Sequence, residues 1–160
     1  MMKKKQINAL IKLSKQSEKE CEIKHPNMAG AYYDEKNDRT YISNTYWAIW
    51  FDGLVDGLTM KDTKGTYPRL ETLIGEKCEY VPVDIDCEEV KEKSKTYKKE
   101  DFKNKDKLVR LGDTYFNPKY VLSLISCFTV YQSYVNNKWG LLLLESDGIT
   151  AIICGIREVK

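Results

Sequence analysis

The first twenty residues alternate hydrophobic and polar positions with the period of an α-helix. At about 100° per residue, one side of that helix carries Ile7, Leu10, Ile11 and Ser14. The opposite side carries Lys5, Asn8, Lys12, Lys15 and Lys19. This pattern predicts an amphipathic helix that ends near residues 18–20 and has a narrow row of lysines along its polar side.

Short segments of β-forming residues follow this helix. Residues 31–34 and 39–42 flank the dipeptide Asn37-Asp38, which tolerates the positive φ of a tight hairpin. Residues 46–51, Tyr-Trp-Ala-Ile-Trp-Phe, are rich in aromatic residues that favour strands. The first third therefore predicts a helix followed by an antiparallel meander.

The middle of the chain is rich in glycine and proline, which is typical of loops. Residues 80–85 predict a short strand, and Pro82 favours the edge of a sheet for it. Asp86 and Glu89 have the spacing of a capping box, so a helix is predicted from there to about residue 99. The lysine-rich residues 91–107 indicate a solvated helix and loop.

The last third repeats the plan of the first. Residues 108–111 and 114–116 are predicted as strands, and Asn117 and Pro118 have the preferred order of an N-cap and a first helical residue. The apolar side of the helix that follows carries Val121, Leu122, Leu124, Ile125 and Phe128. Its other side carries Lys119, Ser123 and Ser126. We therefore predict a second amphipathic helix with serines on its polar side.

A second meander is predicted over residues 130–135, 138–145 and 149–157. The chain then contains two helix-plus-meander units, residues 4–56 and 108–160. An irregular connector with a charged helix joins them over residues 57–107. The predicted fold is a single α+β domain with two helices on one face of an antiparallel sheet.

Composition limits the function classes that remain. The 160 residues are 42% hydrophobic and 31% charged, which is enough to bury a core and excludes a low-hydrophobicity disordered chain. The 26 basic and 24 acidic residues do not by themselves indicate a nucleic-acid partner. No apolar run is long enough to span a membrane, and no apolar signal core follows the basic start, so we expect a cytoplasmic protein.

Residue patterns for catalysis and metal binding are absent from the sequence. It contains no glycine-rich phosphate loop, and its single histidine, His25, lies in a loop-like stretch without a nucleophile motif. The five cysteines include no C-x-x-C pair, so we expect reduced thiols packed as small hydrophobic side chains. The sequence predicts a non-enzymatic protein without cofactor or metal. An apolar pocket joining His25 to a carboxylate or thiol would favour a small-molecule enzyme instead.

Four segments carry a family resemblance. Residues 113–122, Asp-Thr-Tyr-Phe-Asn-Pro-Lys-Tyr-Val-Leu, resemble the closing unit of the bacterial DNA polymerase III beta sliding clamps, where a strand enters the last helix through Phe-Asn-x-x-Tyr-Leu/Val. Residues 30–33 and 42–48 stand where that family has a Gly-Val-Tyr-Phe-like strand and Thr-Asp-Gly-x-Arg-Leu. Residues 67–74 are similar to the family's Phe/Tyr-Pro-Asp-Tyr-x-x-x-Ile connector. The segments follow one another in the family's order.

The resemblance also implies where partners would bind. In the family, a groove for polymerase and other replication proteins is formed in part by the arginine of the first motif and by a terminal Met-Pro-Met-Arg-Leu. Trp47 stands at the arginine position here, and Ile156 and Arg157 lie in the stretch that replaces the terminal motif. These three residues are the predicted partner-binding residues. Because the familiar subunit has three such domains, a ring of that size implies a homo-oligomer of roughly six copies joined through edge strands.

Two interpretations of function follow. The resemblance implies that the helices face duplex DNA and contact its phosphates without reading bases. The predicted contact residues are Lys5, Lys12, Lys15, Lys19 and Lys119. The alternative is a clamp-fold protein-interaction module with no DNA binding, for which the aromatic strand and the serine-faced helix argue. In that case the row of lysines is an ordinary solvated helix face.

Overall fold

The N-terminal amphipathic helix is confirmed as α1 (Lys4–Cys21) in a computed structural model, which describes residues 2–61, 67–146 and 148–156. The buried side of α1 consists of Gln6, Leu10, Leu13, Ser14, Ser17 and Cys21. Ile7 and Ile11 are only half-buried, so the buried side is rotated slightly from the apolar side that the pattern predicts. The lysines lie opposite this buried side, as predicted.

The first meander consists of β1 (Tyr32–Asp34), β2 (Arg39–Ser43) and β3 (Trp47–Asp52). The predicted hairpin turn is confirmed, with Asp38 at a φ of 50°. Between β2 and β3, the Asn44 side chain accepts hydrogen bonds from the backbone of Tyr46 and Trp47, both at 2.9 Å. This side chain closes the turn that leads into β3.

The second half contains α3 (Pro118–Ile125) and its own meander, β7 (Gln132–Asn136), β8 (Leu141–Ser146) and β9 (Ile149–Cys154). Asn117 caps α3 as predicted, because its side chain accepts a hydrogen bond of 2.8 Å from the backbone of Lys119. Before α3, β5 (Val109–Leu111) and β6 (Thr114–Phe116) pair as a separate two-stranded hairpin.

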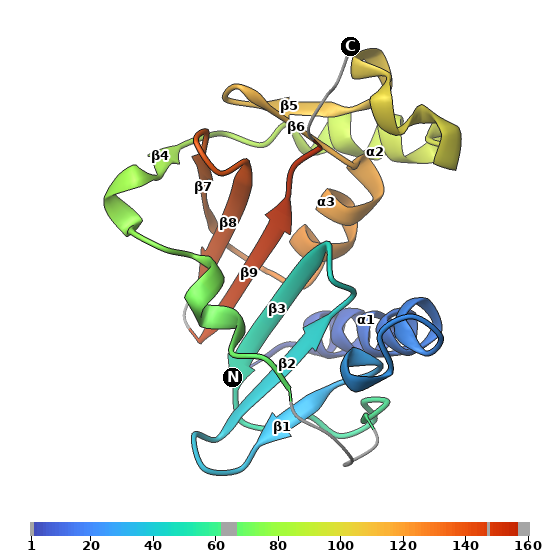
Figure 1. The fold of residues 1–160 in the computed structure, drawn as a ribbon, viewed down its shortest axis with the longest axis vertical. Coiled ribbons are helices and arrows are strands. Elements are labelled where there is room, and N and C mark those ends of the chain that lie inside the picture. The colour runs from blue at the N-terminus through green and yellow to red at the C-terminus, as the bar shows by residue number, and fades with distance from the viewer. Residues whose placement is uncertain (1, 62–66, 147, 157–160) are drawn as a thin grey trace.

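The two meanders merge into one antiparallel sheet (Figure 1). Strands β3 and β9 pair along five residues, from Trp47 opposite Ile153 to Phe51 opposite Ile149. The resulting sheet has seven strands in the order β1-β2-β3-β9-β8-β7-β4. The predicted strand around Pro82 is reduced to β4 (Val81–Pro82), and it lies at the edge as expected. The α+β class is confirmed.

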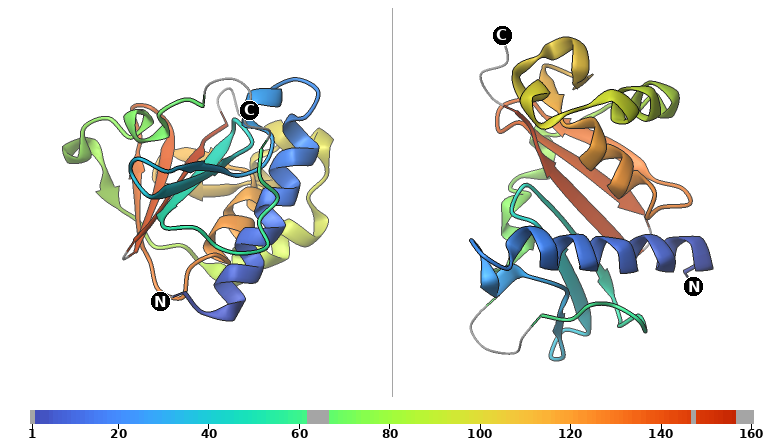
Figure 2. Two further views of the ribbon diagram at one scale, coloured as in Figure 1. Left: turned by 90° about the horizontal axis from the view of Figure 1, so that it is seen from below. Right: turned by 90° about the vertical axis from the view of Figure 1, so that its right-hand side faces the viewer.

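Helices α1 and α3 cover one face of this sheet, as predicted, and a third helix packs against α3 and β5 (Figure 2). Leu10 of α1 and Val121 of α3 belong to one buried cluster with Ile49 and Leu142 of the sheet. Val90 of α2 (Cys87–Thr96) joins the same cluster. Because α2 has no counterpart beside α1, the two halves of the chain differ in this layer.

The connector covers the opposite face of the sheet. Leu70 and Tyr80 pack there against Tyr41, Trp50 and Leu143. The connector contains the short 3-10 helices η2 (Leu70–Leu73) and η3 (Lys77–Glu79). Further 3-10 turns are η1 (Pro26–Met28), η4 (Lys99–Lys103) and η5 (Lys105–Lys107). Among the described residues, no helix has the length and apolar character needed to cross a membrane.

Candidate nucleic-acid interface

The five lysines that sequence analysis singles out are all exposed. Four of them, which we call the lysine stripe, lie along α1: Lys5, Lys12, Lys15 and Lys19. Lys119 lies in the first turn of α3. Within the described part of the chain, none of the five forms an ion pair with a carboxylate. Their charges are therefore available to an anionic partner.

The neighbouring helix α2 has a different electrostatic character. Its three lysines each lie close to a glutamate of the same helix. The pairs are Lys91–Glu88, Lys93–Glu89 and Lys95–Glu92, at 3.8, 3.6 and 3.2 Å. In α1 the only acids are Glu18 and Glu20, both near its C-terminal end. The lysines of α1 therefore differ from those of α2 in forming no ion pair with a carboxylate among the described residues.

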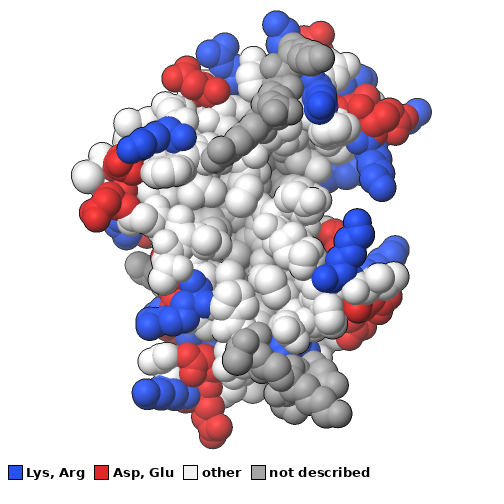
Figure 3. Space-filling view, in the orientation of Figure 1, with Lys and Arg blue, Asp and Glu red and all other residues white. Residues whose placement is uncertain are grey.

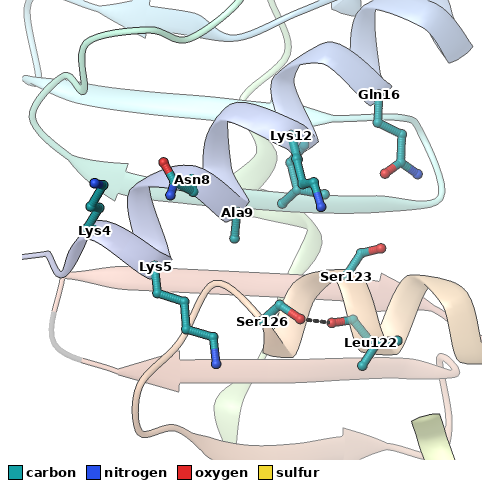
Figure 4. A pocket seen from close by; sticks show the side chains of 10 residues that line it. Lys4, Lys5, Asn8, Ala9, Lys12, Gln16, Leu122, Ser123 and Ser126 are labelled. Carbon is teal, nitrogen blue, oxygen red and sulfur yellow. Dashed lines mark hydrogen bonds between the residues drawn. The ribbon is translucent and has the colours of Figure 1, made fainter.

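A groove of about 930 Å³ separates α1 from α3, and we call it the α1–α3 groove (Figure 4). Its α1 wall consists of Lys4, Lys5, Asn8, Ala9, Lys12, Leu13 and Gln16. Its α3 wall consists of Leu122, Ser123 and Ser126. The two helices run in opposite directions, and the side chains of Lys5 and Lys12 extend from α1 toward α3. Two of the five predicted lysines therefore line the groove, whereas Lys15, Lys19 and Lys119 do not.

The hydroxyl groups on the α3 wall differ in their hydrogen bonding. Ser126 Oγ donates to the carbonyl oxygen of Leu122 at 2.7 Å, within its own helix. The Ser123 hydroxyl has no hydrogen-bond partner among the described residues and points toward α1 (Figure 4). At one end of the groove, the Gln6 side chain donates to the carbonyl oxygen of Cys127 at 3.1 Å, which fixes the spacing of α1 relative to the end of α3.

Trp47 is not at the surface, so its predicted role as a partner contact is wrong. The side chain is 1% exposed and packs in the cluster beneath α1 and α3. All residues of β3 from Trp47 to Phe51 are buried, because helices cover one face of the sheet and the connector covers the other. Alternation along the strand therefore does not separate inner from outer positions here.

The exposed aromatic residue of this region is Tyr46, which sequence analysis did not single out. It lies in the turn before β3, is 61% exposed, and stacks on Tyr120 with ring centroids 6.3 Å apart. Its position next to the Asn44-Thr45 turn is the sequence signal that points to exposure. Of the other two predicted partner residues, Ile156 is half-buried, and its backbone N–H donates to the carbonyl oxygen of Tyr115 at 2.7 Å. Arg157 lies outside the described residues.

A second groove, which we call the connector groove, has a volume of about 660 Å³. The connector contributes residues 72–76 and Glu79, the β7–β8 turn contributes Trp139, and the end of β9 contributes Cys154 and Gly155. Leu73 and Trp139 are 52% and 53% exposed. Charged side chains gather around the rim of the face seen in Figure 3, and its centre carries none.

Ionisable groups with shifted pKa values hold the connector in place. Burial raises the pKa of Tyr41 to about 12, and the hydroxyl donates to Glu71 Oε2 at 2.6 Å. Burial acts to raise the pKa of Glu71, but hydrogen bonds from Tyr41 and Arg39 bring it below its usual value. Among the described residues, no group of His, Cys, Asp and Glu could hold a metal ion, and His25 is exposed before η1.

Fold and surface together define an α+β protein whose helix layer has one basic helix and one serine-faced helix separated by a groove. The chain matches no protein-family model, and a comparison with curated proteins likewise finds no match.

Proposed function

We propose that the protein is a non-enzymatic, sliding-clamp-like protein associated with DNA replication, which contacts duplex DNA without sequence specificity. The observation that carries this proposal is the lysine stripe, which is exposed along α1 and forms no ion pair with a carboxylate among the described residues. The order of clamp-like segments along the chain supports the same reading. Lysine side chains contact phosphates as point charges, and such phosphate contacts carry no sequence information.

The spacing of the lysine stripe fits contact with a phosphate backbone. Lys5, Lys12 and Lys19 recur every seven residues, which is about 10.5 Å along a helix. Phosphates of one DNA strand follow one another every 3.4 Å or so along the axis, so each interval spans about three nucleotides. Several lysines of α1 can thus approach one backbone at the same time.

Duplex binding measured over a range of salt concentrations tests this proposal. We expect the wild-type affinity to fall steeply with salt, because phosphate contact releases counterions. Replacing Lys5, Lys12, Lys15 and Lys19 by glutamine is expected to lower the slope of log K against log salt by up to about 3.6, at about 0.9 per lost contact. The control replaces Lys91, Lys95, Lys99 and Lys103, which are exposed on α2 and η4, and is expected to bind like wild type. An affinity without salt dependence would contradict the proposal.

A second candidate function, a clamp-fold protein-interaction module without DNA binding, is favoured by the connector groove. The groove is bordered by Cys154 and Gly155, which stand where the resemblance has its partner-binding terminal motif. The exposed carboxylate of Glu76 at its rim favours a peptide with apolar anchors and one basic residue.

Trp139 provides an intrinsic probe of this second candidate, because Trp47 and Trp50 are buried. A panel of short peptides with apolar anchors and one basic residue is titrated against the protein. Binding in the connector groove is expected to shift the Trp139 emission, and Leu73→Asp is expected to abolish the shift. Peptide binding together with salt-independent or absent DNA binding would favour this candidate over the first.

A further inference from the structure

We propose that the α1–α3 groove holds a single sugar-phosphate strand of nucleic acid, with Lys5 and Lys12 contacting phosphates from one wall and Ser123 donating a hydrogen bond from the other. This inference rests on the proposed function and assigns the contact to one part of the surface. The outer lysines Lys15 and Lys19 then contribute only long-range attraction.

The walls of the groove have the chemistry of an anion site. Lys5 and Lys12 extend across it, and Ser123 offers a hydroxyl that no other described residue engages (Figure 4). Ammonium and hydroxyl groups are among the donors that proteins most often direct at phosphate oxygens. Among the described residues no carboxylate lines the groove, and at one end of it the Gln16 amide donates to Glu20 Oε1 at 2.7 Å. An anionic ligand beside Lys5 and Lys12 would therefore meet donors from both walls.

The length of the groove suits one strand with the spacing that it has in a stacked duplex. The lining residues of α1 run from Lys4 to Gln16, which corresponds to about 18 Å of helix. At roughly 3.4 Å per nucleotide along one strand, this length accommodates about five nucleotides. Ala9 and Leu122 are half-buried and provide apolar surface in the groove, against which the carbon atoms of the sugars can pack.

Two pairs of lysines on α1 differ in their position relative to the groove. Lys5 and Lys12 line it, whereas Lys15 and Lys19 are exposed on the same helix outside it. Removing either pair changes the net charge of the protein by the same amount. A difference between the two double variants therefore reports the location of the strand and not the total charge.

The test compares Lys5→Gln/Lys12→Gln with Lys15→Gln/Lys19→Gln in salt titrations with a short mixed-sequence duplex and with a single-stranded oligonucleotide. We expect the first double variant to lower the salt slope for duplex DNA by about 1.8, which corresponds to two contacts at about 0.9 each. The second double variant is expected to lower the slope by clearly less than the value of one contact. Circular dichroism and thermal unfolding confirm that both variants are folded.

A charge introduced on the opposite wall gives an independent measurement. Ser123→Asp is expected to weaken binding at least tenfold, because its carboxylate repels the phosphates, and Ser123→Ala is expected to weaken it a few fold. Thr72→Asp is the control, since Thr72 is exposed on η2, in the connector that covers the other face of the sheet. This variant has the same net charge as Ser123→Asp and is expected to bind normally.

The outcomes distinguish this inference from the function on which it rests. If duplex DNA binds with a salt slope but the two lysine pairs contribute equally, or Ser123→Asp binds normally, the strand does not lie in the groove and only this inference fails. If no nucleic acid binds at any salt concentration, the proposed function fails with it. If an acidic peptide binds and nucleic acid does not, the groove is a protein-binding site and the inference is overturned.

Discussion

At the scale of single residues, a polar cluster joins the connector to the sheet. Glu71 Oε2 accepts hydrogen bonds from the Tyr41 hydroxyl at 2.6 Å and from Arg39 at 3.1 Å. Tyr67 stacks on Tyr32 beside them, with ring centroids 4.8 Å apart. Because the Glu71 side chain is mostly shielded from water, these bonds are worth more than those of an exposed ion pair.

Glu71→Gln is expected to lower the free energy of unfolding by about 1–2 kcal/mol at neutral pH. The pKa of Glu71 is lowered in the folded protein from its ordinary value of 4.5, so its contribution is complete above pH 4.5 and is lost as the pH falls through the lowered pKa. The difference from wild type should therefore shrink in acid. Denaturant unfolding at neutral and acidic pH measures it, with Asp52→Asn, whose side chain is 66% exposed, as the control. If the difference in unfolding free energy between wild type and Glu71→Gln grew in acid, the lowered pKa of Glu71 would be contradicted.

Trp47 gives a second prediction at this scale. Since the side chain is fully enclosed, Trp47→Ala is expected to cost about 3–5 kcal/mol of folding free energy. Tyr46→Ala, at the exposed neighbouring position, should cost much less. Thermal unfolding of both variants checks this order. A stable, fully folded Trp47→Ala protein would show that the ring is not part of the core.

At the scale of elements, local signals in the sequence account for the helix boundaries. The spacing of apolar residues predicts α1, and the Asn117-Pro118 pair predicts the start of α3, because helix periodicity and capping depend on residues only a few positions apart. The length of β4 was not predictable in this way. Residues beyond Pro82 favour a strand, but the ladder with β7 consists of Val81 and Pro82, and the contact ends with hydrogen bonds between Val83 and Ser133, which is a consequence of tertiary placement.

The cap of α3 can be tested directly. Asn117→Ala is expected to lower the free energy of unfolding by about 1 kcal/mol, because the backbone N–H of Lys119 loses its partner. Asn27→Ala is the matched control, since Asn27 is exposed in η1. Denaturant unfolding of the two variants measures the difference, and equal stabilities would show that the cap contributes nothing.

At the scale of the whole molecule, the edges of the sheet limit how copies can join. The edge strands are β1, with three residues, and β4, with two residues that include Pro82. The end of β1 is further covered where Ala31 bridges Met60. Few free backbone groups remain on either described edge for pairing with another copy, and proline lacks the N–H donor. The structure therefore offers little support for the edge-joined ring that the resemblance implies.

We accordingly expect the isolated protein to sediment as a monomer of 18.6 kDa at micromolar concentration. Sedimentation velocity at several concentrations measures this. A stable species of about six copies would contradict the expectation and favour a closed ring. A monomer could contact DNA from one side only, which is compatible with the binding proposed for the α1–α3 groove.

The sequence by itself determined the α+β class, the position of α1 and α3, both meanders and the exposed side of the lysine stripe, because these depend on local periodicity, caps and turns. Tertiary structure decided what long-range packing controls. In the folded protein Trp47 is buried in a sheet that is covered on both faces, and α2 packs beside the other helices. Two of the four lysines of the stripe line the α1–α3 groove, and the other two are exposed outside it. These features depend on contacts between residues that are far apart in the sequence, so no local pattern could reveal them.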